Sequence, residues 1–167
     1  CQELLQVLET DDIFYFIHTV QGVFVNTVDR YQPHFKALYE KFAEELAETG
    51  VQIMDMKTNF FANECRNVVS VIDYIREHPE LEIIKIELMI ADDTQKEGLR
   101  GKLKTSQTYV FESYQQTLEV VNPLATKGAA IKTYLKNFPD AKSYGIGDGE
   151  NDLPMFAAVD ISVAMAN

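Results

Sequence analysis

Three oxygen-bearing side chains crowd a glycine-rich stretch near the C-terminal end of the sequence. Asp148, Asn151 and Asp152 stand in the run Gly147-Asp-Gly-Glu-Asn-Asp152. Carboxylate and amide oxygens are hard ligands of the type that Mg²⁺ prefers. Glycines at positions 145, 147 and 149 permit backbone angles and close approaches that side chains would block. The stretch therefore predicts a Mg²⁺ site in which Asp148 ligates the metal, Asp152 ligates it or holds its water, and Asn151 orients a substrate oxygen.

The elements around this acidic turn (residues 147–152) support that prediction. Residues 144–147 read as a short buried strand and Leu153 begins a helix, so the turn follows the carboxyl end of a strand, where open parallel sheets bind ligands. Asp152 also directly precedes the helix and could be a plain N-cap instead. A Gly/Asp turn with only a structural role is the other alternative. A dinucleotide loop is disfavoured because Asp148 and Glu150 would repel a pyrophosphate.

Lys127 is the second candidate site residue. It opens a predicted helix over residues 127–137, so its ammonium and the positive end of the helix point the same way. Such a pairing suits a phosphate group. The alternative is a solvated surface charge with no role in binding.

The remaining chain divides into two parts with different patterns. Residues 1–122 predict helices covering one face of a mostly antiparallel sheet, with a boundary at Asn122-Pro123. The expected elements are helices over 2–9, 33–50, 64–78 and from 92 onward, and strands over 13–19, 23–27, 84–90, 107–113 and 117–121. Residues 123–167 alternate helix and strand, which is typical of a parallel sheet. Two parallel strands, 144–147 and 161–165, cannot cover themselves, so we expect the missing strands to lie elsewhere in the same core or in a partner chain.

Composition limits the kinds of partner. The 167 residues carry 15 basic and 26 acidic side chains, a net charge of −11, which disfavours nucleic acid or an anionic membrane. A small phosphorylated metabolite remains compatible if a metal ion or a lysine offsets the negative field. No apolar run approaches the roughly 18 to 20 residues of a membrane span. Cys1 and Cys65 are too few for a disulfide framework, so a reducing, cytoplasmic setting is expected.

The acidic turn and the lysine segment together resemble a known family. Residues 147–152 with Met155-Phe156 resemble the fourth motif of haloacid dehalogenase-like (HAD-like) hydrolases, and Thr126-Lys127-Gly128 resembles their third motif. Residues 163–167 are similar to a Val-Ala-Met-Gly-Asn segment of the Cof-like sugar-phosphatase subfamily, with Ala166 where Gly is usual. The resemblance implies an α/β fold: part of a HAD-like (Rossmannoid) core over 123–167 and an inserted α+β cap domain over 1–122.

The resemblance also implies an activity and roles for the candidate residues. It implies a Mg²⁺-dependent phosphatase that hydrolyses small phosphate esters, often sugar phosphates, through an aspartyl-phosphate. Asp148 and Asp152 would then serve the metal. Lys127 would stabilise the phosphate, and Asn151 would contact the substrate or its phosphate.

Two motifs of the family are missing from the sequence. The family's nucleophile lies in an Asp-x-Asp motif, whereas Asp11-Asp12 and Asp92-Asp93 are adjacent pairs, and no second-motif Ser or Thr is recognised. We therefore identify no catalytic nucleophile and expect this chain alone to be inactive. Both ends look cut, as in a cap and C-terminal half-core of a longer enzyme. The alternative is a non-catalytic, truncated or degenerate relative that serves as a binding or interaction module.

Overall fold

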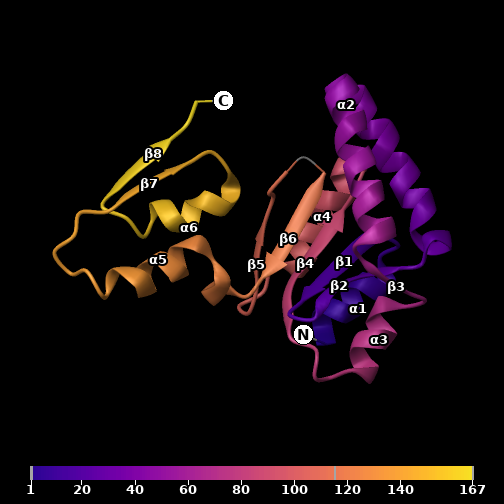
Figure 1. Ribbon diagram of the computed structural model, residues 1–167, viewed down its shortest axis with the longest axis horizontal. Coiled ribbons are helices and arrows are strands. Elements are labelled where there is room, and N and C mark those ends of the chain that lie inside the picture. The colour runs from indigo at the N-terminus through magenta and orange to yellow at the C-terminus, as the bar shows by residue number, and fades with distance from the viewer. Residues whose placement is uncertain (1, 115, 167) are drawn as a thin grey trace.

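A computed structural model describes residues 2–114 and 116–166 of the chain. Two sheets divide these residues into a large part, which ends at Val121, and a small part, which follows Asn122 (Figure 1). The predicted domain boundary between residues 122 and 123 remains a prediction. The elements of the large part are α1 (Gln2–Thr10), β1 (Phe14–Thr19), β2 (Gly22–Asn26), α2 (Val28–Asn63), β3 (Arg66–Val68), α3 (Val71–Glu77), β4 (Ile83–Met89), α4 (Asp93–Leu103), β5 (Tyr109–Phe111) and β6 (Thr117–Val121).

The large part is built on a six-stranded sheet in the order β3-β2-β1-β4-β6-β5. β2 and β3 are parallel, and the other neighbours are antiparallel. The mostly antiparallel sheet is therefore confirmed. Alternate side chains of β1 enter different cores: Tyr15 and Ile17 pack with α1, α3 and α4, whereas Phe14 and Phe16 pack with α2. The prediction that helices cover one face of the sheet is wrong, because α1, α3 and α4 pack on one face and α2 packs on the other.

The helix predicted over residues 33–50 is both longer and bent. α2 begins at Val28, so Pro33 lies inside it, and helical structure continues past Gly50 to Asn63. The chain leaves helical geometry at Ala47 (φ 49°, ψ −128°), and the two arms fold back beside each other (Figure 1). A Cβ at Gly50 would lie 2.0 Å from the carbonyl oxygen of Phe42, so this glycine permits the close return of the second arm rather than ending the helix.

The helix predicted from residue 64 is a strand followed by a shorter helix. β3 pairs with β2 through residues 66–68, and α3 begins at Val71 with Ser70 as its N-cap. Ser70 Oγ accepts a hydrogen bond from the Asp73 N–H, and this cap fixes the start that the apolar spacing alone could not locate. Asp92 caps α4, because its Oδ1 accepts a hydrogen bond from the Gln95 N–H at 2.6 Å.

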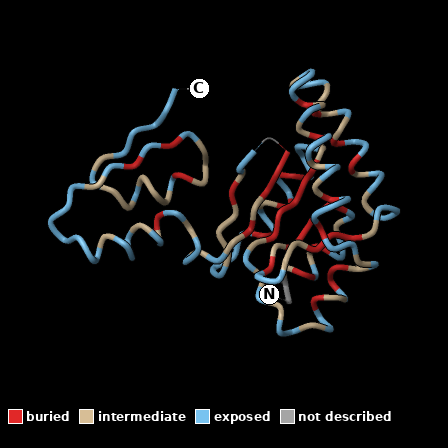
Figure 2. Tube along the Cα trace, in the orientation of Figure 1, coloured by how far each residue is buried: buried red, intermediate tan, exposed pale blue. Residues whose placement is uncertain are grey.

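The small part is a thin layer with one uncovered apolar face. It contains the 3-10 turn η1 (Pro123–Ala125), α5 (Lys127–Leu135), β7 (Tyr144–Gly147), η2 (Glu150–Asp152), α6 (Leu153–Phe156) and β8 (Ile161–Ala164). β7 and β8 pair in parallel, as predicted. Tyr144 and Ile146 are 61% and 64% exposed, and Figure 2 shows this layer mostly exposed or half-buried.

None of the apolar residues at positions 131, 134, 135 and 138 is buried within the described chain. Tyr134 and Phe138 are exposed, and α5 ends at Leu135, before Phe138. The side chains contact each other, with ring centroids 5.1 Å apart, but no described element covers them.

None of the helices described is long and apolar enough to cross a membrane.

A buried charge cluster lies on the α2 side of the sheet. The carboxylate of Glu87 on β4 is 3.1 Å from the ammonium groups of both Lys57 and Lys85, and 3.5 Å from His18 Nε2. Burial alone would raise the pKa of Glu87. The neighbouring His18, Lys57 and Lys85 outweigh that effect and lower the pKa from 4.5 to about 2.

Glu87 should therefore make the fold sensitive to acid. Because the folded-state pKa lies below the unfolded value, its contribution is present above pH 4.5 and is lost as the pH falls towards 2. The full contribution is about 3 kcal/mol. We expect Glu87→Gln to flatten the decline in unfolding free energy between about pH 5 and pH 2, measured by urea titration at each pH. The matched control is Glu44→Gln, at an exposed position of α2; identical pH slopes for the two variants would contradict the assignment.

Candidate active site

The acidic turn lies at the carboxyl end of β7, as its sequence predicts. The strand ends at Gly147, Asp148 follows it, and η2 carries the chain through Asn151 and Asp152 into α6. Asp148 is exposed, Asn151 is half-buried and Asp152 is buried. The structure thus brings the three predicted oxygen-bearing residues to one end of a parallel strand pair.

Asp152 organises the turn. Its Oδ2 accepts hydrogen bonds from the backbone N–H groups of Asp148 (3.1 Å) and Gly149 (3.2 Å). Its side chain makes no capping bond to the helix at Leu153, so the plain N-cap alternative is wrong. The carboxylate instead points back to the turn that carries Asp148, and holds the turn's backbone in place.

Lys127 meets the acidic turn through Asp152. The Lys127 ammonium donates to Asp152 Oδ1 at 2.5 Å, although Lys127 is far from the turn in sequence. The side chain of Asp152 is 6% exposed and that of Lys127 is 51% exposed. The ion pair with Lys127, helped by the two backbone N–H groups, lowers the pKa of the Asp152 carboxyl against the opposing effect of burial. Asp152 is therefore anionic near neutral pH and holds a cation at the rim of the site.

Two glycines make this arrangement possible by leaving room. A Cβ at Gly147 would lie 2.4 Å from Asp152 Cγ, and one at Gly128 would lie 2.0 Å from the carbonyl oxygen of Pro154. Gly128 thus lets the first turn of α5 rest directly on α6, which places Lys127 beside Asp152. Thr126 caps the same helix by accepting from the Ala129 N–H. The turn glycines do not have left-handed φ angles, so close approach is what they contribute.

The donor set fits a hard cation in part. Asp148 lies exposed at the strand end, and both oxygens of Asp152 are engaged by Lys127 and the backbone. Across residues 2–114 and 116–166, no three His, Cys, Asp or Glu side chains converge as a metal site. The predicted metal roles of Asp148 and Asp152 and the substrate roles of Lys127 and Asn151 remain predictions. Chemically, the arrangement offers an anionic ligand and a cation side by side, which suits a metal-bound phosphate.

Sequence reasoning missed a contact to the same turn. Glu150 binds the guanidinium of Arg100 on α4, at 2.7 Å and 3.0 Å. Arg100 lies between the inward-facing Leu99 and Leu103 of an amphipathic helix, and nothing in that spacing indicates a partner fifty positions away. Only the tertiary arrangement of the two parts reveals this pair.

Comparison with known families supports the resemblance noted in the sequence. The family model for haloacid dehalogenase-like hydrolases matches residues 1–167. The chain belongs to this HAD-like family. No curated protein sequence gives a significant match to it.

Solved structures share the fold of this chain at low sequence identity. A HAD-like hydrolase from B. subtilis is 16% identical, with a TM-score of 0.74, and the match covers 98% of this chain and 59% of that one. SMU.1108c from Streptococcus mutans UA159 is 16% identical, with a TM-score of 0.65, and the match covers 99% and 56%. The HAD subclass IIB sugar phosphatase BT4131 is 17% identical, with a TM-score of 0.57, and the match covers 98% and 59%. This HAD-like chain therefore spans less than two thirds of the length of these structures.

Proposed function

We propose that the complete protein containing this chain is a Mg²⁺-dependent phosphatase for small phosphate esters, with sugar phosphates as the favoured class. The observation that carries the proposal is the ion pair between Lys127 and Asp152 at the end of β7. It joins the two segments that resemble the third and fourth motifs of the HAD-like family. A sugar phosphatase among the similar structures supports the substrate class.

In this proposal the chain's residues bind and neutralise the phosphate. Asp148 would ligate Mg²⁺ directly, and Asp152, whose oxygens are engaged, would hold the metal's water shell and orient Lys127. The Lys127 ammonium would neutralise phosphoryl oxygens, and Asn151 would contact the substrate or its phosphate. Bound Mg²⁺ would supply further charge neutralisation at the phosphate.

The attacking carboxylate would come from outside these 167 residues. The sequence contains no Asp-x-Asp motif. The exposed apolar residues of β7 and α5 provide a surface on which further core strands could pack, and the matched structures are longer than this chain. Attack on phosphorus would give an aspartyl-phosphate and release the alcohol, and water would then release phosphate. Residues 1–122 would form the cap, which excludes water and selects the substrate.

Metal dependence tests the proposal directly. We expect the complete protein to hydrolyse p-nitrophenyl phosphate and a panel of sugar phosphates in the presence of Mg²⁺. We also expect EDTA to abolish turnover and excess Mg²⁺ to restore it. Phosphate release that persists in EDTA would contradict the metal role, and no release from any ester in Mg²⁺ would favour a non-catalytic binding module.

A cytoplasmic setting belongs to the same proposal and is consistent with the free, buried thiol of Cys65.

A further inference from the structure

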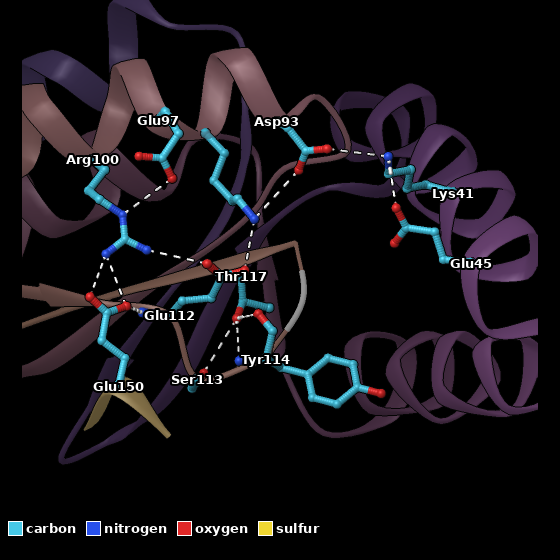
Figure 3. Close-up of polar contacts among 11 residues, drawn as sticks. Lys41, Glu45, Asp93, Glu97, Arg100, Glu112, Ser113, Tyr114, Thr117 and Glu150 are labelled. Atoms are coloured by element: carbon cyan, nitrogen blue, oxygen red, sulfur yellow. Dashed lines mark hydrogen bonds and ion pairs between the residues drawn. The ribbon is translucent and has the colours of Figure 1, made fainter. Parts of the chain in front are cut away.

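A network of charged side chains connects the large part to the acidic turn (Figure 3). Glu150 extends from the turn towards α4 and the end of β5. Its carboxylate accepts from Arg100 Nη1 at 2.7 Å and 3.0 Å, and from the backbone N–H of Glu112 at 2.7 Å. Its backbone carbonyl accepts from the Tyr109 hydroxyl at 3.4 Å. All of these hydrogen bonds cross from the large part to the turn, and each ends on Glu150.

The partners of Glu150 are themselves fixed in the large part. Arg100 Nη2 lies 3.3 Å from Glu112, and Lys96 binds the same carboxylate at 2.8 Å. Lys96 also lies 3.6 Å from Asp93, which pairs with Lys41 of α2 at 3.4 Å. The side chain of Arg100 is 22% exposed. Charge-assisted hydrogen bonds with shared partners and limited solvent access are stronger than an isolated surface pair.

Glu150 stands two positions from Asp148 and two from Asp152, within the same tight turn. A contact that fixes Glu150 against α4 therefore also fixes where the large part lies relative to Asp148 and Lys127. Sequence motifs assign no task to this residue, and its side chain binds Arg100 and the backbone of Glu112 in the large part.

We propose that Glu150 and Arg100 form the docking contact that holds the cap against the acidic turn, with both acting as positioning residues rather than catalytic ones. The docking role stands on the contacts above. Its effect on catalysis rests on the proposed phosphatase function, because a cap held at the turn would keep the substrate enclosed beside Lys127.

A distance measurement in the complete protein tests the docking role without relying on activity. Spin labels at the exposed positions Thr49→Cys and Lys136→Cys, in a background without other cysteines, would report the separation of the two parts by pulsed electron resonance. We expect Glu150→Gln and Arg100→Gln each to broaden the distances and shift them to larger values. The double variant should add little to either single change, because both remove the same pair.

A second ion pair of the same chemistry provides the matched control. Arg76 binds Glu9 at 2.6 Å and 2.9 Å, with both residues inside the large part. Arg76→Gln should therefore leave the distances unchanged. Distances in Glu150→Gln and Arg100→Gln that match those of Arg76→Gln would overturn the proposal, and circular dichroism would show that each variant is folded.

Kinetics then separate docking from catalysis. If the complete protein is a phosphatase, we expect Glu150→Gln and Arg100→Gln to raise KM about tenfold while turnover at saturating substrate changes less than about threefold. A loss of saturated turnover by about a hundredfold or more, with unchanged distances, would instead place Glu150 in the chemistry and overturn its positioning role. If no phosphatase activity is found, the proposed function fails while the distance measurement still decides the docking contact.

Discussion

Asp148→Asn in the complete protein is expected to reduce phosphate-ester hydrolysis by at least about 10³-fold, equivalent to about 4 kcal/mol of transition-state stabilisation. Asp148 is the first residue beyond β7, and its side chain is exposed at the strand end. Its neighbours on the turn are held by Asp152, so the amide variant should keep the backbone geometry while losing the charge that binds the metal. The measurement is kcat/KM for p-nitrophenyl phosphate across a Mg²⁺ titration.

The control for this variant is Asp140→Asn, an exposed aspartate in the loop between α5 and β7. It removes the same charge from the same part of the chain and should leave turnover within about twofold of the parent. Turnover by Asp148→Asn that equals that of Asp140→Asn would remove Asp148 from the mechanism. A large loss that high Mg²⁺ partly rescues would support the ligand role in particular.

Lys127→Met is expected to lower kcat/KM by about 10²- to 10³-fold, the loss typical of removing one preorganised donor from a developing negative charge. The Lys127 side chain is half-exposed, and its ammonium is paired with the buried Asp152 of the acidic turn. Removing it also leaves the Asp152 carboxylate without its cation, and we expect a measurable loss of unfolding free energy in the same variant.

Lys132→Met, at an exposed position on the same helix, is the matched control. Both variants replace a lysine of α5 by methionine and lose the same charge. General effects of net charge and helix propensity therefore cancel when the two variants are compared. Lys127→Met should fall well below Lys132→Met in turnover at temperatures where both are folded. Equal turnover for the two would mean that Lys127 is a surface charge, the alternative that its sequence position left open.

The small part could be predicted well because its signals are local. Short-range spacing and capping predict the tight turn around glycines 145, 147 and 149. They also predict the parallel strand pair and the helix after Thr126. The ion pair between Lys127 and Asp152 was not predictable from spacing, although the family resemblance placed both residues in one site. Its geometry depends on Gly128 resting on Pro154, which is a tertiary contact.

The large part shows where local patterns fail. A glycine such as Gly50 often marks the end of a helix. Here Gly50 allows the second arm of α2 to pass close to Phe42 of the first arm. The apolar residues from Val68 to Ile75 fit one helical stripe. Val68, the first of them, instead belongs to β3, which pairs with β2 at the edge of the sheet. Glu87 alternates with the apolar residues Ile86 and Leu88 along β4, a pattern that predicts a solvent-facing side chain. It instead lies buried among cations. In each case the deciding contact is a tertiary one, which the local sequence pattern does not contain.

We propose that the acidic turn and Lys127 form half of a phosphatase site. The most direct measurement compares Mg²⁺-dependent hydrolysis of p-nitrophenyl phosphate by the complete protein and by residues 1–167 alone, at equal concentration and with folding checked by circular dichroism. We predict turnover by the complete protein that Asp148→Asn abolishes, and none by the 167 residues. Metal-dependent turnover by residues 1–167 alone, or none by the complete protein with any phosphate ester, would contradict the account.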